Sequence, residues 1–177
     1  MMRRASKERQ SQEERMALAV RDLHIAAYLL PESPLRHRLL RTAKVVNRPA
    51  GKHKRRQSIV TLKDMAYTIA EGHALPESWQ PDPELFQRIS SDLNAMSGVE
   101  RERSEDKNRG RTKRSKEEHT AIADGLDNIS KAFSHMGLAG RQSEAATKWA
   151  TSAMKKLPSL PSVWHEHRVN REKIERK

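Results

Sequence analysis

The chain has 177 residues, of which 35 are Lys or Arg and 23 are Asp or Glu, so its net charge at pH 7 is +12. It contains no cysteine, which excludes a disulfide scaffold, a cysteine-ligated metal cluster and a thiol nucleophile. Leu, Ile, Val and Phe together number 31, below the roughly 20% under which a highly charged chain is a candidate for disorder. These totals leave open whether the chain folds at all.

No apolar run approaches the roughly 18–20 residues that a membrane-spanning helix needs. The basic start, Met1 to Arg4, is followed by no apolar stretch, so it does not have the pattern of a secretory signal. We therefore expect an intracellular protein without a transmembrane segment, cytoplasmic or, if the source or host is eukaryotic, nuclear.

The positive charge is concentrated at one end of the chain. Residues 1–60 contain 15 basic and 5 acidic residues, whereas residues 61–98 contain 2 and 6. Residues 119–177 contain 10 basic and 6 acidic residues, a smaller excess. Localised positive charge is the expected footprint of contacts with a phosphate backbone, although acidic proteins and anionic membranes respond to the same field.

The N-terminal third predicts two helices. Apolar residues recur at helical spacing from about Lys7 to Leu30, and Pro31 ends that helix. Ser33 and Pro34 follow as an N-cap and a first helical position, and the second helix extends to about Val46. The two segments predict a helical hairpin.

The middle of the chain predicts a basic loop and two further helices. Residues 47–57 lack periodicity and are interpreted as a flexible basic loop. Thr61 caps the next helix, for which Gly72 is the C-terminal glycine. The proline-containing residues 73–83 form a loop, Asp82 and Pro83 begin another helix, and Gly98 ends it.

The C-terminal part predicts a linker and three helices. Residues 99–114 are almost entirely charged or polar, which predicts a linker. Ser115 and Glu118 form a capping box for a strongly periodic helix that Gly137 closes. A helix rich in small residues follows over 143–157, and a basic helix is expected over 163–177.

These elements predict an all-α fold made of small helical bundles, with a basic flexible loop, a charged linker and basic termini. We divide the chain into a basic helical module at 1–98, the linker at 99–114, and a helical association segment with a basic tail at 115–177. Each part has few large apolar residues, so we expect self-association or docking on a protein complex to complete its core.

The densest basic cluster lies in the predicted loop, with further cations just upstream. Arginine suits phosphate contact because its guanidinium binds two oxygens at once. No aromatic residue is interleaved with these cations, so backbone contacts are favoured over base stacking. The predicted nucleic-acid-binding residues are Arg36, Arg38, Arg41, Lys44, Arg48, Lys52, Lys54, Arg55 and Arg56.

The two C-terminal helices and the tail supply the predicted partner interface. Their apolar stripe can pack against a partner, and tryptophan is enriched among the residues that carry most of the binding energy at interfaces. The predicted interface residues are Ile122, Leu126, Ile129, Phe133, Trp149 and Trp164.

No catalytic residue, metal site or cofactor is predicted. His165 and His167 stand two positions apart, so on a helix they point in different directions and do not ligate one ion. The phosphate-loop, dinucleotide and nucleophile-elbow motifs are absent from the chain. We expect no enzymatic activity.

Two functions remain open at this point. The first is a nucleic-acid-binding protein, for DNA or RNA, that acts as an accessory factor or as a subunit of a larger nucleoprotein complex, of a viral or plasmid kind. The second is a structural assembly protein, such as a virion or matrix-like component, whose basic face meets a genome, an acidic partner or a membrane surface.

Overall fold

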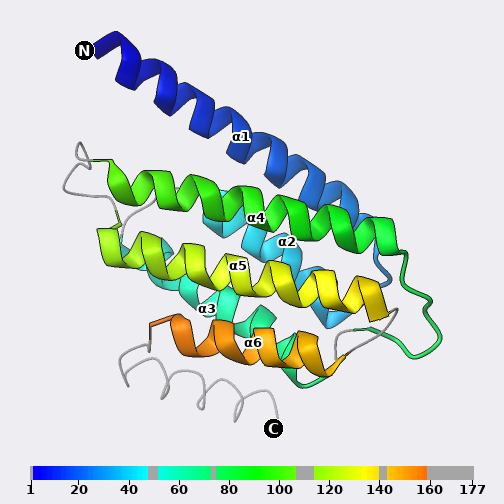
Figure 1. Ribbon diagram of the computed structural model, residues 1–177. Helices are drawn as coiled ribbons and strands as arrows, with labels where there is room; N and C mark the ends of the chain where they lie inside the picture. Colours follow the sequence, from blue (N-terminus) through cyan, green and yellow to red (C-terminus); the bar gives the residue numbers. More distant parts are fainter. Residues whose placement is uncertain (1, 48–51, 73–74, 107–113, 140–142, 159–177) are drawn as a thin grey trace, which may run out of the picture.

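The computed structural model describes residues 2–47, 52–72, 75–106, 114–139 and 143–158, with side chains described from residue 10 in the first helix and from residue 57 in the third (Figure 1). All six elements in these ranges are helices, which confirms the all-α prediction. They are α1 (Met2–Leu29), α2 (Pro34–Asn47), α3 (Lys52–Ala70), α4 (Pro83–Glu105), α5 (Lys116–Ala139) and α6 (Glu144–Lys156).

The helices pack in a closed ring. α4 and α5 lie side by side, with α1 on the outer side of α4 and α6 on the outer side of α5 (Figure 1). The α2–α3 hairpin closes the ring, because α2 packs on α1 and α3 packs on both α6 and α5. Segments distant in the chain therefore become neighbours: α1 contacts α4, and α3 contacts α6.

Several helix starts match the predicted caps. The Ser33 hydroxyl accepts a hydrogen bond from the backbone N–H of Arg36 (3.3 Å), and the Asp82 carboxylate accepts one from Glu84 (3.0 Å). Ser115 and Glu118 form a reciprocal capping box, with distances of 2.9 and 3.1 Å between backbone nitrogen and side-chain oxygen. These bonds satisfy N–H groups that have no partner within their own helix.

The prediction for the start of α3 is wrong. α3 begins at Lys52 rather than at Thr61, so residues 52–57 of the predicted loop are helical. Thr61 lies inside the helix, where its hydroxyl donates to the carbonyl of Gln57 (2.8 Å). Lys, Arg and Gln are good helix formers, and neither proline nor glycine interrupts this run after Gly51.

The predicted end of α4 at Gly98 is also wrong, because α4 continues to Glu105. Val99, Glu100 and Ser104 are buried, so residues 99–105 of the predicted linker form a packed part of the helix. The apolar stripe of α4 carries on past Gly98 at the same period, but its inward positions are now partly polar. In contrast, Gly72 follows α3 with a φ of 73°, as the C-terminal glycine prediction requires.

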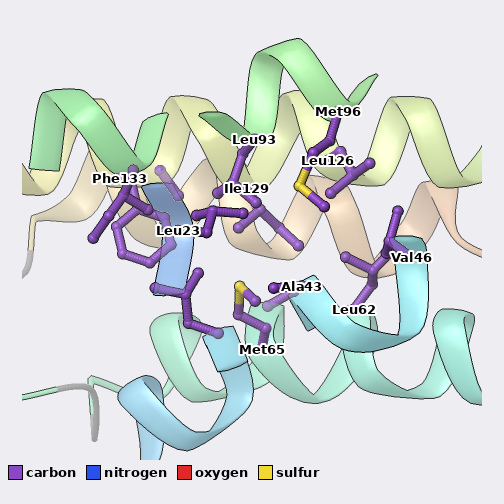
Figure 2. Close-up of a cluster of buried hydrophobic side chains, with 14 of the residues drawn as sticks. Leu23, Ala43, Val46, Leu62, Met65, Leu93, Met96, Leu126, Ile129 and Phe133 are labelled. Carbon is purple, nitrogen blue, oxygen red and sulfur yellow. The ribbon is translucent and has the colours of Figure 1, made fainter. Parts of the chain in front are cut away.

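Buried side chains from all six helices form one hydrophobic cluster. Leu23 of α1, Met65 of α3 and Leu93 of α4 point into the same space as Ile129 and Phe133 of α5 (Figure 2). Residues of both 1–98 and 115–158 belong to this cluster. The two parts of the sequence therefore bury their apolar faces against each other. None of the helices in the described ranges is long and apolar enough to cross a membrane.

Two helical glycines test how closely α4 and α5 are packed. A Cβ added at Gly137 would lie 2.7 Å from Cβ of Phe86, whereas a Cβ at Gly98 would meet nothing within 4 Å. We expect Gly137→Ala to lower Tm, because Phe86 or the backbone has to shift. Gly98→Ala should stabilise the protein by about 0.5–1 kcal/mol through helix propensity. Thermal unfolding of both variants checks this pair. A higher Tm for Gly137→Ala would contradict the close approach.

Candidate functional site

A long stretch of the chain, covering α2 and most of α3, carries positive charge only. Between Ser33 and Lys63 there is no aspartate or glutamate. The basic residues in this stretch are Arg36, Arg38, Arg41, Lys44, Arg48, Lys52, Lys54, Arg55, Arg56 and Lys63. We call the segment from Arg41 to Arg56, where α2 ends and α3 begins, the basic corner.

The outer face of α2 presents part of this charge to solvent. His37, Arg41 and Lys44 are exposed and recur at spacings of four and three, so they share one face of the helix. In the described part of the chain, neither Arg41 nor Lys44 forms an ion pair with an acidic side chain. Both cations are therefore available to an external anion.

The structure divides the predicted binding residues, because two of them are held within the protein. The Arg38 guanidinium pairs with Asp64 of α3 at 3.2 Å. Arg36 lies 3.4 Å from Glu32, and its guanidinium carbon is 5.1 Å from the centre of the Tyr28 ring. Both arginines are half-buried and fix the α1–α2 and α2–α3 junctions.

The remaining predicted cations surround the turn between α2 and α3. Arg48 lies outside the described residues. Lys52, Lys54, Arg55 and Arg56 form the first turns of α3, and only their backbone is described. The hydroxyl of Ser58, just after them, donates to the carbonyl of Val45 in α2 at 3.4 Å. This contact brings the start of α3 against the end of α2, where Lys44 is exposed.

A buried cluster of charged groups lies beneath the basic corner. Glu100 of α4 is fully buried, and its Oε1 accepts hydrogen bonds from the guanidinium groups of Arg103 (2.9 Å) and Arg114 (3.2 Å). Its Oε2 lies 2.5 Å from Nδ1 of His119, the first inward residue of α5. An ionised carboxylate only accepts hydrogen bonds, so Nδ1 of His119 carries the hydrogen. Glu100 is thus paired on both oxygens.

Arg114 connects this cluster to both helices of the basic corner. Its Nη2 donates to the Ser58 hydroxyl at 2.7 Å and lies 3.5 Å from the carbonyl of Val45. One buried guanidinium therefore contacts α2 and α3 while it neutralises Glu100 of α4. We infer that the cluster fixes the basic corner to the α4–α5 pair.

Electrostatic contacts decide the charge state of Glu100. Burial alone raises the pKa of a carboxyl, but the hydrogen bond from His119 and the charges of Arg114 and Arg103 outweigh it, and the pKa of Glu100 is lowered. Sequence reasoning missed this residue because it lies in a run that resembles a solvated linker. Continuing the α4 stripe through Ile89, Leu93 and Met96 places Glu100 on the core side, and that signal identifies it.

The predicted partner interface is corrected by the structure. Ile122, Leu126, Ile129 and Phe133 are completely buried in the core of the chain, so they are not available to a partner. α4 and the other helices of the ring cover this apolar stripe of α5.

Trp149 of α6 is half-buried beside that core, and Nζ of Lys131 lies 4.3 Å from the centre of its ring. Trp164 lies outside the described residues. The helix expected over 163–177, with His165 and His167, lies outside them too.

A second carboxyl with a shifted pKa lies between α1 and α4. Burial, and then repulsion from Asp22, raises the pKa of Asp92 to about 7, although the charges of Arg88 and Arg21 partly oppose the shift. Within the described ranges, no group of three His, Asp or Glu side chains is arranged to hold a metal ion. The charge of Asp22 in α1 thus acts on the carboxyl of Asp92 in α4 and adds to the effect of burial on its pKa.

Comparison of the chain with protein-family models, with curated proteins and with solved structures finds no match.

Glu100→Gln should destabilise the protein by about 3–5 kcal/mol, because it leaves the buried Arg114 guanidinium without its counter-charge. Arg101→Gln, one residue away, removes the contacts of a half-exposed guanidinium with Asp124 and Asp127 and should cost about 1 kcal/mol. Urea unfolding of both variants measures the difference. Equal losses of unfolding free energy in the two variants would show that the Glu100 cluster stabilises the protein no more than an exposed ion pair does.

Acid sensitivity gives a second test of Glu100. Since its pKa is lowered in the folded state, its contribution is complete above the unfolded value of about 4.3 and is lost as pH falls through the lower folded value. The free energy of unfolding of Glu100→Gln should therefore fall less steeply with acid than that of the wild type. If the free energies of unfolding of the two proteins fall in parallel as the pH is lowered, the lowered pKa is contradicted.

The contribution of Asp92 to stability changes with pH in the opposite direction to that of Glu100. A folded-state pKa of about 7 means that the folded state binds a proton which the unfolded state releases, so stability declines as pH rises from about 4 to 7. Asp92→Asn should raise Tm at pH 8 and leave it nearly unchanged at pH 4. An equal effect at both pH values would show that Asp92 does not titrate in this range.

Proposed function

We propose that this protein is a non-enzymatic nucleic-acid-binding protein that contacts the phosphate backbone through the basic corner. The observation that carries the proposal is the acid-free stretch from Ser33 to Lys63, which places Arg41 and Lys44 on one exposed face beside the start of α3. Each phosphate neutralised by such a cation releases condensed counterions, and this favours binding.

The packing of α2 against α3 supports the proposal, in addition to the number of cations. The Ser58 contact with Val45 and the buried Arg114 bring the end of α2 and the start of α3 together. Cations on a helical backbone lose less backbone conformational entropy on binding than the same residues on a flexible loop. The helical start of α3 therefore strengthens the proposal, although the sequence favoured a loop there.

The mode of binding follows from the residues present. Phe, Tyr and Trp are absent from Leu35 to Ala66, so stacking on unpaired bases has no platform within the basic corner. Contacts to phosphate position a protein without reading sequence. We propose backbone-dominated binding to DNA or RNA with little sequence preference, as an accessory factor or a subunit of a larger nucleoprotein complex.

Salt dependence tests the proposal directly. The affinity for a generic duplex should fall linearly on a log–log plot against salt, with a slope of about 0.9 per neutralised phosphate. Arg41→Gln combined with Lys44→Gln should reduce that slope by about 1–2. Fluorescence anisotropy over a salt titration measures it.

The matched control removes two exposed cations elsewhere. Arg88→Gln combined with Lys148→Gln lowers the net charge equally, on α4 and α6, and should leave the slope within error of the wild type. Equal effects of the two double variants would indicate non-specific attraction to net charge. A wild-type affinity that is independent of salt would contradict the proposal altogether.

The alternative function is a structural assembly protein whose basic face meets an acidic protein, a packaged genome or an anionic membrane. The same charge distribution supports it. Tighter binding of the wild type to vesicles containing anionic lipid than to a duplex at the same salt would favour this alternative.

A further inference from the structure

α1 lies at the outer edge of the ring, where it packs on α4 and α2 (Figure 1). The buried residues of its inward face are Met16, Ala19, Val20, Leu23, Ala26, Ala27 and Leu30. Three of these are alanines, which remove little apolar area from water. The contacts of α5 with α4 and α6, and of α3 with α2 and α6, do not involve α1. Release of α1 therefore leaves the other helices of the ring in contact.

A carboxyl group lies inside the contact between α1 and α4. Asp92 of α4 is half-buried there, and in the described part of the chain its buried Oδ2 has no hydrogen-bond partner. A buried carboxylate oxygen without a donor is costly, whereas a protonated carboxyl is neutral. The placement of this oxygen therefore favours the protonated form of Asp92 while α1 is packed on α4.

The charged groups around Asp92 come from these same two helices. Asp22 of α1 is the like charge, and its carboxylate pairs with the neighbouring Arg21 at 2.9 Å. Arg21 and, on α4 itself, Arg88 are the opposite charges, and they only partly oppose the effect of burial. Both signs therefore act on Asp92, and neither arginine restores the solvation that its carboxyl loses on burial.

α5 also packs on α4, but its charges are engaged elsewhere. Its carboxylates Asp124 and Asp127 both pair with Arg101 of α4. The pKa of Asp92 is raised to about 7, first by burial and then by repulsion from Asp22. Both of these causes require α1 to be in place, because α1 covers Asp92 and carries Asp22.

We propose that the contact between α1 and α4 is a pH-sensitive device, in which ionisation of Asp92 favours a state with α1 released from the rest of the ring. While the carboxyl is protonated, α1 stays packed on α4. Once it is ionised, a charge without a hydrogen-bond donor lies in the helix contact beside Asp22. The released state, in which water solvates the carboxylate, then gains population. This inference is independent of the proposed nucleic-acid binding.

The packed state binds a proton that the released state loses. The pKa of Asp92 is about 7 when α1 is packed and about 4 when the carboxyl is solvated. The equilibrium constant for release of α1 should therefore rise about tenfold between pH 6 and pH 8. Below about pH 4 the carboxyl is protonated in both states, so this constant no longer changes with pH.

Amide hydrogen exchange of the full-length protein measures the release of α1. Each exchange rate is divided by the intrinsic rate at the same pH, so that the opening equilibrium remains. Protection from Met16 to Leu30 should be lower than at the centre of α5, near Ile129, and should fall about tenfold between pH 6 and pH 8. Equal protection in α1 and α5 would overturn the proposal, because α1 would then open only when the whole protein unfolds. Protection of α1 that does not change with pH would overturn it too.

A variant and a matched control assign the effect to Asp92. Asp92→Asn keeps the size of the neutral carboxyl and cannot ionise, so the protection of α1 should no longer change between pH 6 and pH 8. Glu84→Gln removes an exposed carboxylate of the same helix and should keep the tenfold fall. The same pH dependence in both variants would overturn the assignment to Asp92.

Carboxyl-carbon NMR of the wild-type protein follows the titration of Asp92 without any substitution. A midpoint near pH 7 is expected, because the packed helices disfavour the ionised form. A midpoint near the ordinary aspartate value of about 4 would overturn the proposal, whatever the exchange of α1.

Discussion

The carboxylate of Glu100 is the group on which the arrangement of this protein depends. A charge placed at the core side of α4 is costly unless it is fully paired, and here Arg103, Arg114 and His119 supply the partners. The pairing requires α4, α5 and Arg114, two residues before α5, to be in register. Through Arg114, the cluster also holds Val45 and Ser58 in place. It thereby fixes the end of α2 and the start of α3, which form the basic corner.

The rest of the fold distributes a small amount of apolar material efficiently. Few large residues are available, and the ring of helices directs one stripe from each helix into a shared cluster instead of building two separate cores. α4 and α5 achieve close contact through Gly137, which lets α5 approach Phe86. The surplus positive charge is excluded from this core and gathers where α2 and α3 meet. The exposed apolar side chains Leu18, Ile25, Tyr28 and Leu29 remain uncovered on the outer side of α1.

Much of the fold follows from local patterns in the sequence. Periodicity and caps identify the helices, and Ser33, Asp82 and Ser115 cap them as expected, because these signals act over three or four residues. The errors arise where a local signal competes with tertiary packing. The run after Gly98 resembles a linker by composition, yet its inward polar residues find partners on other elements. Likewise, the apolar stripe of α5 indicates an interface with a partner until α4 is known to cover it.

The candidate site was predictable as a basic segment of the sequence. Which of its cations are exposed was not predictable: Arg38 is paired and Arg41 is exposed because of where Asp64 of α3 lies.

We propose that the end of α2 and the start of α3 form one anchored, cationic surface that contacts phosphate. Amide hydrogen exchange of the full-length protein, with and without a saturating short duplex at low salt, tests it most directly. We expect the protection gained on binding to be confined to the region from about Arg41 to Ser58, with no change in the buried centre of α5. Protection centred on another helix, or no protection anywhere in the presence of the duplex, would contradict it.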